Sequence, residues 1–160
     1  MRKELLDFAD ISQVNVLNNF RTLGISKREV VLGGSASMAL FGIRRNRDID
    51  AIVTKKVWDG LEDNDRFKSK LADPKRESSK YFYHTKVPAI TLFEIDYPLG
   101  YTAEEALKDD NISFEFEGFH FETLEHLIKW KKAMGREKDL VDIQLIRRFL
   151  KNSKQWLQYG

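Results

Sequence analysis

Apolar residues near the start of the chain follow a helical period. Between Ile11 and Leu23 they recur mostly at steps of three or four, which is typical of the buried face of an amphipathic helix. Gly24 follows this stretch, and glycine commonly ends helices. A helix over residues 11–23 is therefore predicted.

The pattern then changes to that of buried strands. The run at residues 29–32 is short and rich in β-branched side chains, and Gly33-Gly34 ends it. Ser35 follows as the expected N-cap of a short helix. The neighbouring elements predicted from the same pattern are a helix at 36–41, a strand at 48–53 and a helix at 55–61.

The middle of the chain contains a polar segment followed by several runs that are typical of strands. Residues 63–79 are polar and contain Pro74, so a loop is expected there. Runs at 81–84 and 89–97 predict two strands that pair as a hairpin, and residues 112–121 predict two short strands that turn at Gly118.

Helical periodicity returns at the end of the chain, where Thr123 caps one predicted helix and another follows Gly135. The fold class is therefore predicted to be α+β, with a mixed twisted sheet flanked by helices. We expect one domain over 1–160, with a helical segment at 1–28, a sheet core at 29–121 and helices at 122–160.

Composition narrows the classes of protein that fit. The 160 residues contain 27 Lys and Arg, 25 Asp and Glu, and no Cys. The absence of Cys excludes a disulfide framework and a thiolate metal site, and the charge balance gives no argument for nucleic-acid binding from bulk charge. Without a secretory or membrane-spanning segment, we expect a cytoplasmic protein with no membrane partner.

Carboxylates recur at positions where chemistry is expected. Asp48 and Asp50 are two apart in a predicted strand and so share a face, as Glu94 and Asp96 do in a later strand. Paired carboxylates repel unless a proton or cation intervenes, and such oxygen ligands suit Mg²⁺. With Gly33-Gly34 leaving the backbone open to an anionic ligand, the pattern indicates nucleotidyl transfer.

The arrangement of Gly33-Gly34-Ser35, then Asp48-x-Asp50, then a later strand acid resembles the polymerase-beta-like nucleotidyltransferase superfamily. The segment from Lys131 to Ile143 is similar to one in the abortive-infection toxin (AbiEii-type) branch. The resemblance implies a polymerase-beta-like nucleotidyltransferase fold and an enzyme that moves a nucleoside monophosphate from an NTP to a hydroxyl group.

The resemblance also implies roles for individual residues. Asp48 and Asp50 would hold two Mg²⁺ or Mn²⁺ ions, and Asp96 would hold one and help to activate the acceptor hydroxyl. Ser35 and the backbone N–H groups beside it, in the turn with Gly33 and Gly34, would grip the triphosphate. Asp96 is preferred to Glu94 as the third carboxylate because the resemblance calls for an Asp at the end of the strand; Glu94 could instead be a supporting or solvated group.

The acceptor stays open between a small molecule, RNA such as tRNA, and protein. Relatives commonly carry a further helical domain that defines the acceptor, and 160 residues leave little room for one. A homodimer groove, another partner chain or a macromolecular acceptor could supply the surface that this further domain provides in the relatives. By analogy alone, a toxin role with an antitoxin partner is a further possibility.

Basic residues near these acids have two interpretations each. Arg44 and Arg47 either reach the β and γ phosphates or pair with Asp48 or Asp50. Lys131 and Lys138 either contact phosphate, as the resemblance implies, or are solvated. Asp139 and Asp142 are predicted to pair with neighbouring Arg or Lys rather than to bind metal.

Other candidates receive less support. The histidines His84, His120 and His126 show no metal-ligand spacing, and the alternating aromatic residues from Phe114 to Phe121 fit a core better than a base-stacking site. Two competing functions stay open. A regulatory module would bind NTP without releasing pyrophosphate, and a metal-dependent nuclease would leave the glycine turn unexplained.

Overall fold

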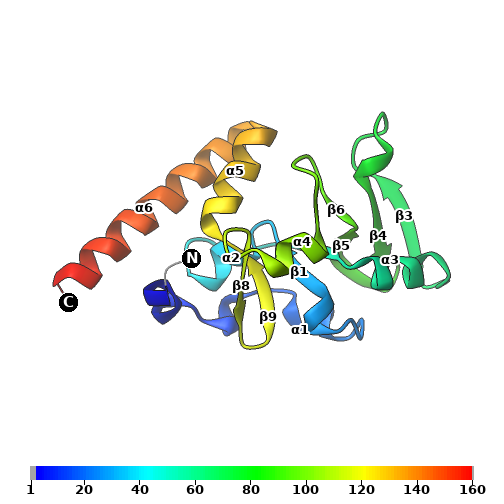
Figure 1. Cartoon of the computed structure of the whole chain (residues 1–160), viewed down its shortest axis with the longest axis horizontal. Coiled ribbons are helices and arrows are strands. Elements are labelled where there is room, and N and C mark those ends of the chain that lie inside the picture. Colours follow the sequence, from blue (N-terminus) through cyan, green and yellow to red (C-terminus); the bar gives the residue numbers. More distant parts are fainter. Residues whose placement is uncertain (1–2, 160) are drawn as a thin grey trace.

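The computed structural model describes residues 3–159, and the side chains of residues 5–155. It is an α+β fold in which helices flank a mixed seven-stranded sheet of order β3-β4-β5-β2-β1-β9-β8 (Figure 1). The predicted fold class of a mixed sheet with flanking helices is thus confirmed. The sheet strands are β1 (Val30–Gly33), β2 (Ile49–Val53), β3 (Phe67–Leu71), β4 (Lys80–His84), β5 (Val87–Phe93), β8 (Ser113–Phe116) and β9 (Phe119–Glu122).

Helices and a small second sheet complete the described chain. A two-stranded sheet pairs β6 (Ile95–Asp96) with β7 (Tyr101–Thr102). The α-helices are α1 (Leu17–Arg21), α2 (Ala36–Leu40), α3 (Lys55–Glu62), α4 (Ala103–Lys108), α5 (Leu124–Met134) and α6 (Glu137–Tyr159). The 3-10 helices are η1 (Lys3–Phe8), η2 (Ile11–Gln13), η3 (Lys27–Glu29) and η4 (Glu77–Ser79).

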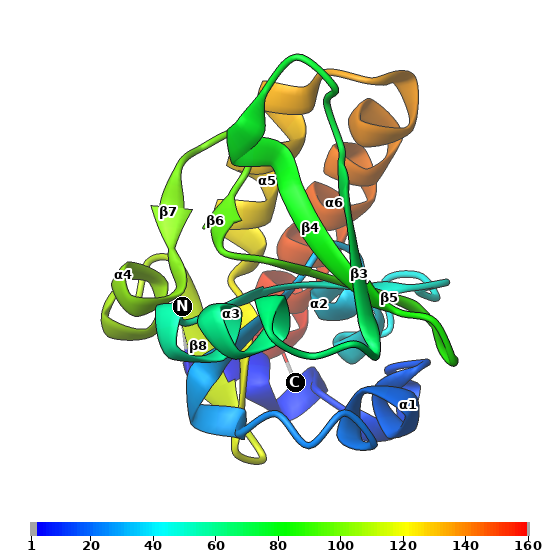
Figure 2. The same ribbon diagram turned by 90° about the vertical axis from the view of Figure 1, so that its right-hand side faces the viewer.

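The two faces of the sheet are covered differently. Side chains alternate between the faces of a strand, and on one face Leu32, Ile49 and Phe121 are fully buried in the main hydrophobic core. The opposite face holds a small cluster around Val31 and Ala106 of α4. α5 and α6 lie side by side in both views (Figures 1 and 2). The less covered face is where the cavity described below opens.

The predicted helix over 11–23 is wrong as a continuous element. The structure instead has η2 and α1, separated at Val16, which adopts a left-handed conformation with φ 71°. A helix needs right-handed φ values in succession, so Val16 interrupts it. Val14 and Phe20 are nevertheless buried, because the apolar periodicity still reports which side chains face the core.

Two predictions for the middle of the chain are also wrong. The loop expected at 63–79 contains β3 and η4, and β3 pairs antiparallel with β4 at the edge of the sheet. The strand expected at 89–97 stops at Phe93, where the chain bends at Glu94 and continues as β6 outside the main sheet.

The strands around the glycine turn and both hairpins agree with the predictions. β4 pairs antiparallel with β5, and β8 pairs with β9 through a turn at Gly118. β9 ends at Glu122, one residue beyond the predicted sheet core. The Thr123 hydroxyl caps α5 by accepting a hydrogen bond from the His126 N–H at 3.1 Å. Ser35 stands at the N-cap of α2, but its side chain accepts no capping bond.

The ends of the predicted terminal segments, at residues 1, 2 and 160, lie outside the described residues. Over residues 3–159, no helix combines the length and apolar character required to span a bilayer.

Candidate active site

The centre of the sheet places a glycine turn beside a carboxylate. β1 and β2 run antiparallel with Gly33 opposite Asp50, and β2 and β5 run parallel with Asp50 opposite Thr91. Residues opposed in neighbouring strands share a face of the sheet. The Thr91 hydroxyl donates a hydrogen bond to Asp50 Oδ1. Three adjacent strands therefore fix the orientation of the Asp50 carboxylate.

The two glycines leave space that a side chain would fill. A Cβ at position 33 would lie 2.9 Å from Glu122 Oε2 and 3.2 Å from the Asp50 carbonyl oxygen. Gly34 has φ +62°, and a Cβ there would lie 3.3 Å from Asp50 Oδ2. A side chain at position 33 would require the Glu122 carboxylate to move, and the positive φ favours glycine at 34. Bare backbone therefore separates two carboxylates.

Glu122 is a buried carboxylate that the sequence reasoning missed. β9 runs parallel to β1 on the side away from β2, which brings Glu122 next to Gly33. The residue is 8% exposed, and its Oε1 has no hydrogen-bond partner among the described residues. Burial, then repulsion from Asp96, raises the pKa of Glu122 well above its ordinary value, although a hydrogen bond from the Gly34 N–H opposes the rise.

Seven carboxylates border one cavity of about 540 Å³, and four of them, Asp48, Asp50, Asp96 and Glu122, surround the glycine turn or carry the predicted chemistry. They come from separate elements: Asp48 precedes β2, Asp50 lies in β2, Asp96 in β6 and Glu122 in β9. A volume of this size is ordinary for a small-molecule site. The cavity lies on the less covered face of the sheet, where the bare glycine turn also opens.

The pKa of Asp50 is raised above its ordinary value. Burial raises its pKa most, and the nearby Asp48 raises it further. The Thr91 hydrogen bond and the positive charges of Arg136 and Lys138 act in the opposite direction. Burial is therefore the main cause of the raised pKa of Asp50, and the charge of Asp48 adds to it.

Asp96 is held by a histidine. His126 Nε2 lies 2.8 Å from Asp96 Oδ2, and the His126 side chain is only 4% exposed. The sequence reasoning gave no role to His126, because a lone histidine in a helix carries no motif. The contact becomes visible only when α5 packs beside β6.

Glu94 and Asp96 lie in different surroundings. Asp96 borders the cavity, whereas Glu94 lies in a separate shallow hollow with Glu62 and Lys80. The bend at Glu94 removes the shared strand face on which the pairing of these two acids was predicted. Of the two candidates for a third carboxylate, only Asp96 faces the glycine turn's cavity.

A network of ion pairs forms one wall. Arg44 makes a bidentate contact with Asp142, with both N–O distances 2.8 Å, and Lys131 Nζ lies 2.8 Å from the same carboxylate. Arg136 binds Asp139 at 2.7 Å. Burial by itself would raise the pKa values of both Asp residues, but the hydrogen bonds to these cations lower them. Asp139 and Asp142 thus pair with Arg and Lys, as predicted.

The predicted basic residues separate into three groups. Arg44 and Lys131 border the cavity but are engaged by Asp142, so the alternative in which Arg44 pairs with Asp48 or Asp50 is wrong. Lys138 borders the cavity and is exposed. Arg47 is exposed and does not border it. The remaining predicted residues Gly33, Gly34 and Ser35 all border the cavity.

Apolar side chains form another wall. Phe93, Tyr97 and Trp130 border the cavity, and the Trp130 indole N–H donates to the Tyr97 carbonyl oxygen at 2.7 Å. The alternating aromatics of β8 and β9 do not border it: Phe119 and Phe121 are buried in the main core, as predicted. One side of the cavity is therefore suited to a flat apolar group and the other to anions and cations.

The donor set fits a divalent cation chemically. Asp48, Asp50, Asp96 and Glu122 offer hard oxygen ligands, and the buried Glu122 Oε1 has no hydrogen-bond partner among the described residues. Over residues 3–159, no three Asp, Glu or His side chains already surround a single ion position. The common metal position for Asp48, Asp50 and Asp96 stays a prediction.

No protein-family model matches the chain, and no curated protein or solved structure matches it significantly.

Proposed function

We propose that this protein is a divalent-cation-dependent nucleotidyltransferase that moves a nucleoside monophosphate from an NTP to a hydroxyl group. One observation carries the proposal: the bare Gly33-Gly34 turn lies directly between Asp50 and Glu122 in a cavity that Asp48 and Asp96 also border. A phosphate chain needs open backbone, and a bound cation needs oxygen ligands. The cavity offers both at one place.

The turn supports binding of the triphosphate. Without side chains at Gly33 and Gly34, phosphate oxygens can approach the backbone closely. The Ser35 side chain accepts no capping bond from its own helix, which leaves its hydroxyl available to a ligand. Lys138 is exposed at the cavity and supplies positive charge for the outer phosphates.

The carboxylates support the chemical step. Mg²⁺, when bound, would neutralise the acids and stabilise negative charge on the reacting phosphate. In this proposal Asp96 takes the proton of the acceptor hydroxyl, and the contact of His126 with its Oδ2, which leaves Oδ1 for the substrate, supports that role. The acceptor oxygen then bonds to the α-phosphorus, the bond from that phosphorus to the bridging oxygen breaks, and pyrophosphate leaves.

The surrounding walls support orientation of the substrate. The buried pairs of Lys131 and Arg44 with Asp142 hold α5 and α6 against the loop before β2. Phe93 and Trp130 provide apolar surface on which a nucleobase can pack. A rigid wall keeps the reacting groups in line, which is how most of the rate of such transfers is obtained.

The test measures transfer of label from each α-phosphate-labelled NTP, with Mg²⁺, to RNA, protein and small-molecule fractions. Asp50→Asn is expected to reduce transfer and pyrophosphate release by at least about 100-fold, because it removes a cation ligand inside the cavity. Asp59→Asn is the matched control, since Asp59 is exposed on α3. NTP binding without pyrophosphate release in the wild type would instead assign a regulatory nucleotide-binding module.

A further inference from the structure

The second half of α6 concentrates basic charge. All 25 Asp and Glu residues of the chain precede Ile143, whereas Arg147, Arg148, Lys151 and Lys154 follow it. Four cations therefore occupy little more than two turns of one helix without any acid. Like charges at this spacing repel one another, so the sequence keeps them together at a cost in stability.

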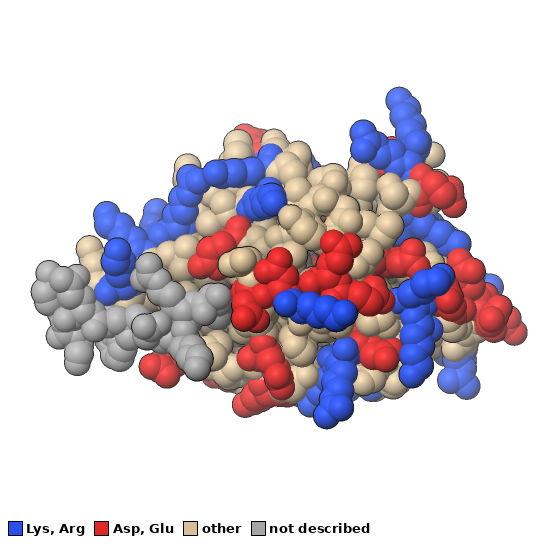
Figure 3. All heavy atoms as spheres, viewed as in Figure 1, with Lys and Arg blue, Asp and Glu red and all other residues tan. Residues whose placement is uncertain are grey.

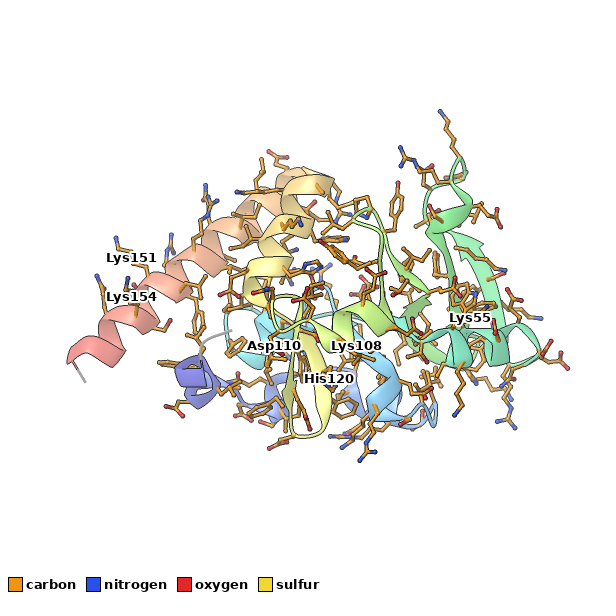
Figure 4. All side chains as sticks on the ribbon, viewed as in Figure 1. Lys55, Lys108, Asp110, His120, Lys151 and Lys154 are labelled. Carbon is orange, nitrogen blue, oxygen red and sulfur yellow. The ribbon has the colours of Figure 1, made fainter. Side chains whose placement is uncertain are left out.

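These cations point away from the core. Ile146 of the opposite helix face is fully buried, and the Phe149 ring packs 5.8 Å from that of Phe8. The four basic residues are exposed, and Lys151 and Lys154 extend outward from α6 (Figure 4). Across the described chain, none of the four side chains makes an ion pair or hydrogen bond.

Basic side chains gather along α6 on one face of the molecule (Figure 3). Basic side chains follow the edge of α6, whereas acidic side chains gather over the centre of the same view (Figure 3). Three of the four Lys and Arg residues that border the cavity differ from those of α6, since Arg44, Lys131 and Arg136 each pair with an Asp, whereas Lys138 has no ion pair with the described residues. The exposed face of α6 is therefore complementary to an anionic polymer outside the cavity.

The helix connects this face to the cavity. Its first turns contribute Lys138, Asp139 and Asp142 to the cavity border. At 1.5 Å per residue, Lys154 lies roughly 24 Å along the helix axis from Lys138. The face begins at Arg147, roughly 14 Å from Lys138 along the same axis, so an extended strand can contact both the cavity border and the whole basic face.

We propose that the exposed basic face of α6, formed by Arg147, Arg148, Lys151 and Lys154, binds the phosphate backbone of a single-stranded nucleic acid. A terminal hydroxyl of that strand reaches the cavity as the acceptor. The acceptor role rests on the proposed function, whereas the binding itself rests on the charges of α6. Recognition of phosphates carries no base sequence, so the binding is sequence-independent.

The test is fluorescence anisotropy of labelled oligouridylate and oligothymidylate, without NTP, over about 50 to 200 mM salt. The triple variant Arg147→Gln, Lys151→Gln, Lys154→Gln is compared with a control of equal charge change, Arg66→Gln, Lys68→Gln, Lys86→Gln, whose side chains are also exposed. Each lost phosphate contact reduces the slope of log K against log salt by about 0.7. The α6 variant should therefore lose about 2 from the slope and bind at least tenfold more weakly, while the control matches the wild type.

Equal slopes and affinities for the wild type and the α6 variant would overturn the proposal. Binding of polyglutamate but neither oligonucleotide would also overturn it, in favour of an acidic protein partner. A preference for oligouridylate over oligothymidylate would support an RNA strand, and the reverse a DNA strand. Asp50→Asn separates the two proposals: binding that depends on α6 in this variant supports the docking face even if no NTP is ever consumed.

Discussion

Glu122 is the residue whose surroundings differ most from those of an ordinary glutamate. It lies beside Gly33, where a Cβ would come within 2.9 Å of Glu122 Oε2, and its other carboxylate oxygen is unpartnered among the described residues. An isolated buried carboxylate is costly unless a proton or a cation neutralises it. When the cavity holds no cation, a proton is therefore expected to neutralise Glu122.

The stability of the protein is expected to depend on pH through Glu122. Because its pKa is raised above the ordinary 4.5 in the folded state, the folded chain binds the proton more tightly than the unfolded chain. This contribution is complete below the ordinary pKa and is lost as the pH rises through the folded-state pKa, by up to about 1.4 kcal/mol per pH unit. Glu122→Gln removes that loss.

Urea unfolding in EDTA at a series of pH values between about 5 and 8 checks this expectation. The wild type should lose free energy of unfolding faster than Glu122→Gln as the pH rises. Glu115→Gln, on the neighbouring strand and exposed, should follow the wild type. Parallel curves for the wild type and Glu122→Gln would show that Glu122 is ionised in both the folded and the unfolded state.

At the scale of elements, local patterns predicted the parts of the site that are close in sequence. The turn at Gly33-Gly34 between β1 and α2, and the strand that carries Asp50, were predicted because strand and turn signals lie within a few residues of each other. The helices α5 and α6 followed from their caps and apolar periodicity. These elements hold most of the predicted cavity residues.

The parts that were missed depend on contacts distant in sequence. β3 has half-buried Phe67 and Leu71 at its ends and exposed residues, including two lysines, between them. This composition is typical of a protected edge strand. In a polar stretch of sequence it is easily taken for a loop. Glu122 enters the site only because β9 pairs with β1, about ninety residues earlier in the chain. No local pattern encodes that pairing, since register between distant strands is set by the whole core.

The ion-pair wall makes Asp142 a structural link between elements. It accepts from Arg44 before β2 and from Lys131 of α5, while lying on α6 itself. The Lys131 side chain is only 5% exposed, and Asp142 is its nearest acidic partner, at 2.8 Å. Removing one partner of a buried pair leaves the other charge uncompensated.

Asp142→Asn is therefore expected to reduce the free energy of unfolding by about 3 kcal/mol. Urea denaturation at neutral pH measures the change. Asp59→Asn breaks an exposed pair with Lys55 on α3, and its cost should stay within about 0.5 kcal/mol. A loss as small as that of the control would mean that Asp139, 3.7 Å from Lys131, is a sufficient partner.

At the scale of the whole molecule, the acids of the cavity should link cation binding to stability. Mg²⁺ or Mn²⁺ that binds the folded chain alone stabilises it by about 2.7 kcal/mol at a concentration 100 times its Kd. Thermal unfolding should therefore shift upward with added cation in the wild type and in Asp59→Asn. Asp50→Asn should respond less, and an equal response in all three proteins would place the cation outside this cavity.

The link between Arg44 and Asp142 spans 98 residues, and this separation has a consequence for synthesis. A chain emerging from the ribosome presents the glycine turn and both acids around β2 long before α6 exists. Domains generally fold as units once their residues are available, so the wall that α6 completes forms only after Asp142 has been made. The glycine turn and the acids around β2 are therefore present on the growing chain before the ion-pair wall that faces them can form.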